Sequence, residues 1–190
     1  MKNGVVYSFF LICFLLLSSV VTAQEGNLSM SQYQLGSGDR IQISVFGQDD
    51  LSMEVRLPDV GTINYPFLGE IKLVGLTAAE VEQLIYKGLL GDYLVNPSVS
   101  VAIVEYRPFF IDGEVKRPGG YAYQPGLSVN KAAALAGGYT ERAARDKITI
   151  IREKDGRTNE FTVTVSDMIQ PGDIITINSL ELRQWLFWPP

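Results

Sequence analysis

Apolar and polar residues alternate along several segments in the first half of the chain, with the two-residue period of a half-buried β-strand. Residues 40–46, 53–57 and 97–105 carry this pattern, and two shorter strands are expected at 62–66 and 70–74. Glycine, proline and aspartate residues stand between these segments and favour turns there. The spacing therefore predicts a sheet that buries one of its faces.

The period changes to that of a helix from Thr77 onward. Thr77 and Glu80 are spaced as in a capping box, in which each side chain accepts a hydrogen bond from the other residue's backbone N–H. We expect an amphipathic helix that packs one face on the sheet and ends near Gly88 and Gly91. The apolar residues at helical spacing are Val81, Leu84, Ile85 and Leu89.

The second half of the chain follows a joint at residues 106–108, because a proline disfavours helix in the residue before it. Ser128 is suited to cap a short alanine-rich helix, and Asp155-Gly156 is a hairpin signal. The expected elements are an apolar run at 109–111, strands at 121–123, 147–152, 160–165 and 174–177, and a helix at 129–136.

One short pattern occurs twice, once in each half of the chain. Gly38-Asp39 and Gly172-Asp173 each precede an alternating strand. The glycine permits a positive φ, and the aspartate can accept hydrogen bonds from backbone amides of the turn. A shared ligand loop is one interpretation. We favour the simpler one, in which two turns use the same local chemistry.

The first 23 residues have the three parts of a secretory signal peptide: a charged start, an apolar middle and small residues before a cleavage site. We predict cleavage between Ala23 and Gln24. An uncleaved membrane anchor is the alternative, because about 20 apolar residues can span a bilayer. Cys13 lies in the middle of the apolar run, where it is not placed to become the lipid-modified first residue of a lipoprotein.

Composition narrows the classes of function. After removal of residues 1–23, which hold Lys2 and no acidic residue, the chain has 15 basic and 21 acidic residues, a net charge of −6. This balance argues against nucleic acid as a partner. Histidine is absent from the whole sequence, and no cysteine follows residue 23, which excludes Ser-His-Asp and Cys-His nucleophiles and ordinary zinc sites. Paired carboxylates, a Ser-Lys pair and oxygen-ligated metals remain as catalytic chemistries, and no residue pattern supports any of them. We expect no catalytic residue, no metal and no cofactor.

Aromatic residues surround a basic pair in the second half of the chain. Tyr106 precedes Lys116 and Arg117 in the sequence, and Tyr121 and Tyr123 follow them. Aromatic faces can stack on sugar rings, and cations suit acidic polysaccharides. We therefore treat these five as candidate contacts to polysaccharide or to a neighbouring protomer. Core packing and a solvated turn are the alternative.

The last residues of the chain are strongly apolar. Large side chains adjoin at Trp185, Leu186, Phe187 and Trp188, close to the final Pro189-Pro190. Such a group is unfavourable in bulk water, and tryptophan is common at membrane interfaces. We expect residues 179–190 to dock on the chain's own surface, on a partner or at a membrane.

Together these motifs resemble the outer-membrane polysaccharide export (Wza-like) family followed by one soluble-ligand-binding β-grasp (SLBB) domain. The resemblance implies an α+β chain, with a mixed export domain of one amphipathic helix at 33–106 and the β-grasp domain at 107–178. Residues 24–32 are then a leader, and 179–190 a C-terminal tail. In the export domain, the matching stretches are Leu35-Gly36-Ser37-Gly38-Asp39 with its strand, then 59–66, Gly69, 75–77 with Glu80, and 97–101. In the β-grasp domain they are Val115, Pro118-Gly119, Tyr121, Leu127, 134–140, Ala143 and Pro171-Gly172-Asp173.

The resemblance also implies a function. It is that of a non-catalytic subunit of a capsule or exopolysaccharide export conduit, in the periplasm and associated with the outer membrane. Its implied partners are the polysaccharide, further copies of the chain in a ring, an inner-membrane polysaccharide copolymerase, and a separate outer-membrane barrel protein if the chain lacks its own pore. A monomeric periplasmic carbohydrate-binding or sensing module is the alternative, and a carboxylate glycosidase is the rival from the enzyme class.

Overall fold

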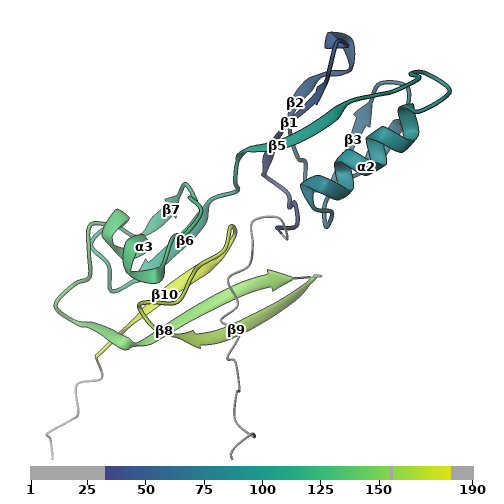
Figure 1. Cartoon of the computed structure of the whole chain (residues 1–190). Coiled ribbons are helices and arrows are strands. Elements are labelled where there is room, and N and C mark those ends of the chain that lie inside the picture. Colours follow the sequence, from purple (N-terminus) through teal and green to yellow (C-terminus); the bar gives the residue numbers. More distant parts are fainter. Residues whose placement is uncertain (1–32, 155, 181–190) are drawn as a thin grey trace, which may run out of the picture.

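The computed structural model describes residues 33–154 and 156–180, which form two domains joined where β5 continues into β6 (Figure 1). The predicted cleavage site at Ala23 and Gln24 and the apolar residues Trp185, Leu186, Phe187 and Trp188 lie outside the described residues. Within the described part of the chain, no helix is long and apolar enough to cross a membrane.

The first domain packs one helix against a three-stranded sheet of order β2-β1-β5, with a separate β3-β4 hairpin. Both neighbours of β1 run antiparallel to it. The alternation of residues 40–45 places Ile41, Ile43 and Val45 in the core, as predicted. The elements are β1 (Arg40–Val45), the 3-10 helix η2 (Asp49–Leu51), β2 (Met53–Arg56), β3 (Thr62–Tyr65), β4 (Gly69–Lys72), α2 (Ala78–Leu89) and β5 (Val99–Glu105).

Helix α2 begins with the predicted capping box. The Glu80 amide donates to the Thr77 hydroxyl, and the Glu80 carboxylate accepts from the Thr77 amide, which holds the pKa of Glu80 below its ordinary value. Val81, Ile85 and Leu89 are fully buried. The expectation that Leu84 also faces the core is wrong, because it lies beside the i, i+4, i+8 stripe and is 39% exposed.

The second domain is a mixed five-stranded sheet of order β7-β6-β10-β8-β9, in which β6 and β10 are parallel. Its core contains Val129, Ala132 and Ala133 of α3 together with alternate residues of β6, β8 and β10. Ser128 caps α3 through its side chain, as predicted. The elements are β6 (Phe109–Gly113), β7 (Gly119–Tyr121), α3 (Val129–Leu135), β8 (Ala143–Lys154), β9 (Arg157–Val163) and β10 (Ile174–Ser179).

Strands β7 and β8 begin earlier than the pattern predicts, because pairing extends them. Strand β8 starts at Ala143, which pairs with Ser179, although residues 143–146 do not alternate. Strand β7 uses Gly119 and Gly120, which the sequence places in a turn. The Phe110 ring lies over Gly120, where a Cβ would come within 2.9 Å of it. A neighbouring aromatic ring can thus compensate for the missing side chain of a strand glycine.

Candidate functional site at the domain junction

A buried aspartate organises the entry to the first domain. Asp39 is wholly inaccessible to solvent. Its Oδ2 accepts hydrogen bonds from the Gly36 amide at 2.7 Å and the Tyr33 hydroxyl at 2.6 Å, and its Oδ1 accepts from the Arg107 amide at 2.7 Å. A buried carboxylate needs such partners, because its desolvation is otherwise strongly unfavourable. The aspartate thereby ties the linker between the domains to the first turn of the first domain.

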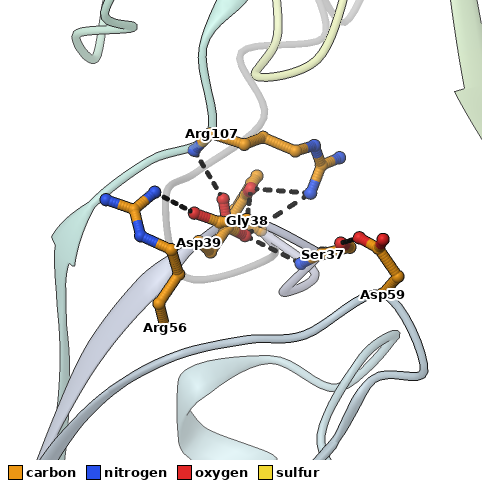
Figure 2. Close-up of polar contacts among 8 residues, drawn as sticks. Ser37, Gly38, Asp39, Arg56, Asp59 and Arg107 are labelled. Carbon is orange, nitrogen blue, oxygen red and sulfur yellow. Dashed lines mark hydrogen bonds and ion pairs between the residues drawn. The ribbon is translucent and has the colours of Figure 1, made fainter.

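The guanidinium of Arg107 completes this arrangement (Figure 2). Its Nη1 lies 3.4 Å from Asp39 Oδ2 and donates to the Tyr33 hydroxyl at 3.1 Å. The side chain fits between two glycines: a Cβ on Gly36 would lie 1.6 Å from Nη1, and one on Gly172 would lie 2.7 Å from Nε. Gly36 belongs to the first domain and Gly172 to the second. Arg107 therefore fills a space that both domains leave open.

Two further interactions support the same turn from the outside, as Figure 2 shows. Arg56 donates to the Gly38 carbonyl at 2.9 Å, and the Ser37 hydroxyl donates to Asp59 at 2.5 Å. Arg56 also forms an ion pair with Glu105 at 3.0 Å. These groups are exposed, and exposed ion pairs contribute little stability. Arg56, Ser37 and Asp59 therefore orient the turn at Gly38 and add little to its stability.

The second Gly-Asp turn has the same construction. Gly172 has φ +85 and Gly38 has φ +88. Asp173 is fully buried and accepts from the Gln170 amide at 2.7 Å, and Arg152 donates to its two oxygens at 2.7 Å each. Both carboxylates are saturated by the chain's own donors. The prediction of shared turn chemistry is confirmed, and neither turn offers a free carboxylate to a ligand.

Three tyrosines pack edge to face across the junction. Tyr33 and Tyr106 have ring centroids 5.2 Å apart, and Tyr106 and Tyr123 have centroids 5.5 Å apart. Burial raises the pKa of all three hydroxyls, and the nearby Asp39 carboxylate raises the pKa of Tyr33 and Tyr106 further. They stay protonated and can donate. Because Tyr33 and Tyr123 come from different domains, the tyrosine chain is a second tie between them.

The five candidate contact residues do not form one cluster. Tyr106 and Tyr123 lie at the junction. Tyr121 stacks on the buried Phe109 at 6.0 Å, and its hydroxyl donates to the Arg117 carbonyl at 2.6 Å. The Lys116 and Arg117 side chains are exposed on the turn before β7. The three tyrosines pack within the chain and stay partly exposed, whereas Lys116 and Arg117 are exposed. A contact of these five residues with polysaccharide or a neighbouring protomer stays a prediction.

Sequence reasoning assigned no role to Tyr33 or Arg107, which complete the junction. Their contacts join residues 68 and 74 positions apart, so neither periodicity nor local spacing indicates them. The repeated Gly-Asp pattern was the one sequence feature that could have indicated this site, since a buried aspartate in a turn needs a cation nearby. Among the described residues, no group of three or more acidic side chains is placed to hold a metal ion.

Two protein-family models match the chain in the order of its domains. Residues 27–104 match the model described as polysaccharide biosynthesis/export protein, and residues 108–160 match the SLBB domain. The chain belongs to the polysaccharide export family. The structure extends the β-grasp sheet past the second matched range, because β10 pairs with both β6 and β8 and ends at Ser179.

Curated relatives agree with this assignment. The exopolysaccharide production protein ExoF of Rhizobium meliloti is 32% identical over 157 residues, covering 72% of this chain and 37% of ExoF. The EPS I polysaccharide export outer membrane protein EpsA of Ralstonia nicotianae is 25% identical, covering 75% of this chain and 44% of EpsA. The polysialic acid transport protein KpsD of Escherichia coli is 25% identical, covering 67% of this chain and 23% of KpsD. The chain thus spans less than half the length of these relatives.

Proposed function

We propose that this member of the polysaccharide export family is a non-catalytic subunit of a conduit that carries capsule or exopolysaccharide out of the cell. It would reside in the periplasm, in association with the outer membrane, and assemble as a ring through which the polymer passes. The polysaccharide, other copies of the chain and an inner-membrane copolymerase would be its partners.

The main support for this proposal is the set of contacts that Arg107 makes at the junction of the two domains. A ring subunit with two domains must present both at a constant angle to its neighbours, and Arg107 is held by Asp39 and enclosed by glycines of both domains. The names of the relatives ExoF, EpsA and KpsD support a role in making or exporting polysaccharide. The saturated carboxylates of Asp39 and Asp173 support a structural use of the buried acids rather than a catalytic one.

Deletion of the gene tests the proposal. We expect surface polysaccharide to be lost while its synthesis continues, so that polymer or its lipid-linked precursor accumulates inside the cell. A plasmid copy of the gene should restore surface polymer. The proposal fails if the purified chain cleaves the polysaccharide and a single Asp or Glu substitution abolishes the cleavage.

The native mass of the purified chain separates the ring from the alternative, a monomeric carbohydrate-binding or sensing module. A ring requires a mass of several chains, and a monomeric module requires the mass of one. A monomer at the concentrations found in the periplasm would favour the sensing module.

A further inference from the structure

The β3-β4 hairpin turns at a phenylalanine in an unfavourable backbone conformation. Residues 65–68 form a turn in which the Leu68 amide donates to the Tyr65 carbonyl at 3.2 Å. Pro66 takes the second position and Phe67 the third, with φ 65. A type II turn has this arrangement and normally has glycine or asparagine at the third position. Among the described residues, Phe67 is the one non-glycine residue with positive φ.

The strained residue holds its ring in solvent. Phe67 stacks on Tyr93, from the loop after α2, with centroids 4.7 Å apart and planes at 26°. Even so, Phe67 remains 64% exposed and Tyr93 47% exposed. The next residue, Leu68, packs inward against Gly88, where a Cβ would lie 2.7 Å from it. The turn is therefore anchored by Leu68, and its conformation directs the Phe67 ring outward.

The fold does not need a phenylalanine at this position. Glycine would adopt the same φ without strain, and Leu68 would still anchor the turn. A bulky residue at positive φ is a genuine outlier, and such strain is concentrated at functional sites. An exposed, strained aromatic ring beside a second exposed ring therefore indicates a contact surface.

We propose that Phe67 and Tyr93 form a stacking surface for sugar rings of the transported polysaccharide; this rests on the proposed function. The C–H face of a pyranose ring packs on a flat aromatic face, and the exposed polar residues Asn64 and Asp92 stand near the two rings in the sequence. Next to Tyr93 in the sequence, Leu90 and Val95 are further exposed apolar residues, so this stretch offers few apolar side chains. A stable protein interface needs about 20–30 residues on each side. A weak contact with single rings suits a polymer that must keep moving.

Three substitutions at Phe67, together with Tyr93→Ala, test the proposal. Phe67→Gly removes both the ring and the strain, Phe67→Leu keeps the strain and an apolar side chain without an aromatic face, and Phe67→Tyr keeps the face. The probe is a set of oligosaccharides made by partial hydrolysis of the surface polymer of the parent strain. Binding to the purified full-length chain is followed by NMR, together with native mass and melting temperature for each variant.

We expect the wild type and Phe67→Tyr to bind alike, whereas Phe67→Gly, Phe67→Leu and Tyr93→Ala bind about tenfold more weakly, as loss of one aromatic stacking contact would produce. Phe67→Gly should melt no lower than the wild type. Equal binding by all variants, or no binding by the wild type, overturns the proposal. Unchanged binding with a reduced native mass overturns it in favour of a contact between copies. The binding assay does not depend on export, so normal export in the deletion strain would refute the proposed function separately.

Discussion

Position 36 requires glycine because the Arg107 side chain lies against it, and not because of the backbone conformation there. Its φ lies outside the positive range, so alanine is compatible with its conformation, but a Cβ there would lie 1.6 Å from the Arg107 guanidinium. We expect Gly36→Ala to displace Arg107 from Asp39 and to lower the free energy of unfolding by about 1–3 kcal/mol, the penalty for an under-satisfied buried group. In an Arg107→Ala background the same change should be neutral or slightly stabilising, because alanine restricts the unfolded chain.

Chemical denaturation of the four proteins in this double-mutant cycle measures the effect. Gly172→Ala is the matched control, since its Cβ would also meet Arg107 but its φ of +85 is unfavourable for alanine. It should stay destabilising in both backgrounds. If Gly36→Ala is equally harmful with and without Arg107, the steric explanation is wrong.

At the scale of elements, the parallel pairing of β6 and β10 depends on a close approach at Gly113. A Cβ there would lie 2.2 Å from the Ile177 carbonyl oxygen, which already accepts from the Glu114 amide at 2.9 Å. Gly126 has nearly the same φ, +78 against +77, with no atom within 4 Å of its Cβ position. We expect Gly126→Ala to cost roughly 1–2 kcal/mol of unfolding free energy from backbone strain alone.

Gly113→Ala should lower the unfolding free energy by more than about twice that amount, because it adds a backbone clash to the same strain. Denaturant unfolding of both variants provides the comparison. Equal losses would mean that β6 and β10 separate without penalty, and that the pairing contributes little to the second domain.

Local signals in the sequence were sufficient for most elements and insufficient for the junction. The capping box of α2 and the alternation of β1 depend on residues close together in the chain, and both formed as expected. Strand β7 was misplaced because Gly119 and Gly120 favour turns until Phe109 to Ile111 supply a partner strand. The contact between Arg107 and Asp39 spans 68 residues, so only the folded chain reveals it. The pairing of Phe67 with Tyr93 likewise depends on tertiary structure.

At the scale of the whole molecule, the last described strand ends before the apolar residues Trp185 to Trp188. The β-grasp sheet ends at Ser179, and the Leu180 amide donates to the Arg142 carbonyl at 2.7 Å. We expect a chain truncated after Leu180 to keep its melting temperature and to lose assembly or export, because Trp185 to Trp188 would no longer contact a partner. Differential scanning calorimetry, native mass and surface polymer distinguish these outcomes. A large drop in melting temperature would instead indicate that the tail docks on its own domain.

The two Gly-Asp turns differ in which part of the chain supplies the arginine that pairs with the aspartate. This difference determines where the chain can be cut into separate domains. Asp173 is neutralised by Arg152 within its own domain, so the β-grasp unit carries everything its turn requires. Asp39 depends on Arg107, which lies beyond the last residue, 104, of the family match to the export domain. A fragment cut at residue 104 would bury a carboxylate without its cation. The smallest export module that can be expressed, exchanged or recombined intact therefore ends no earlier than Arg107.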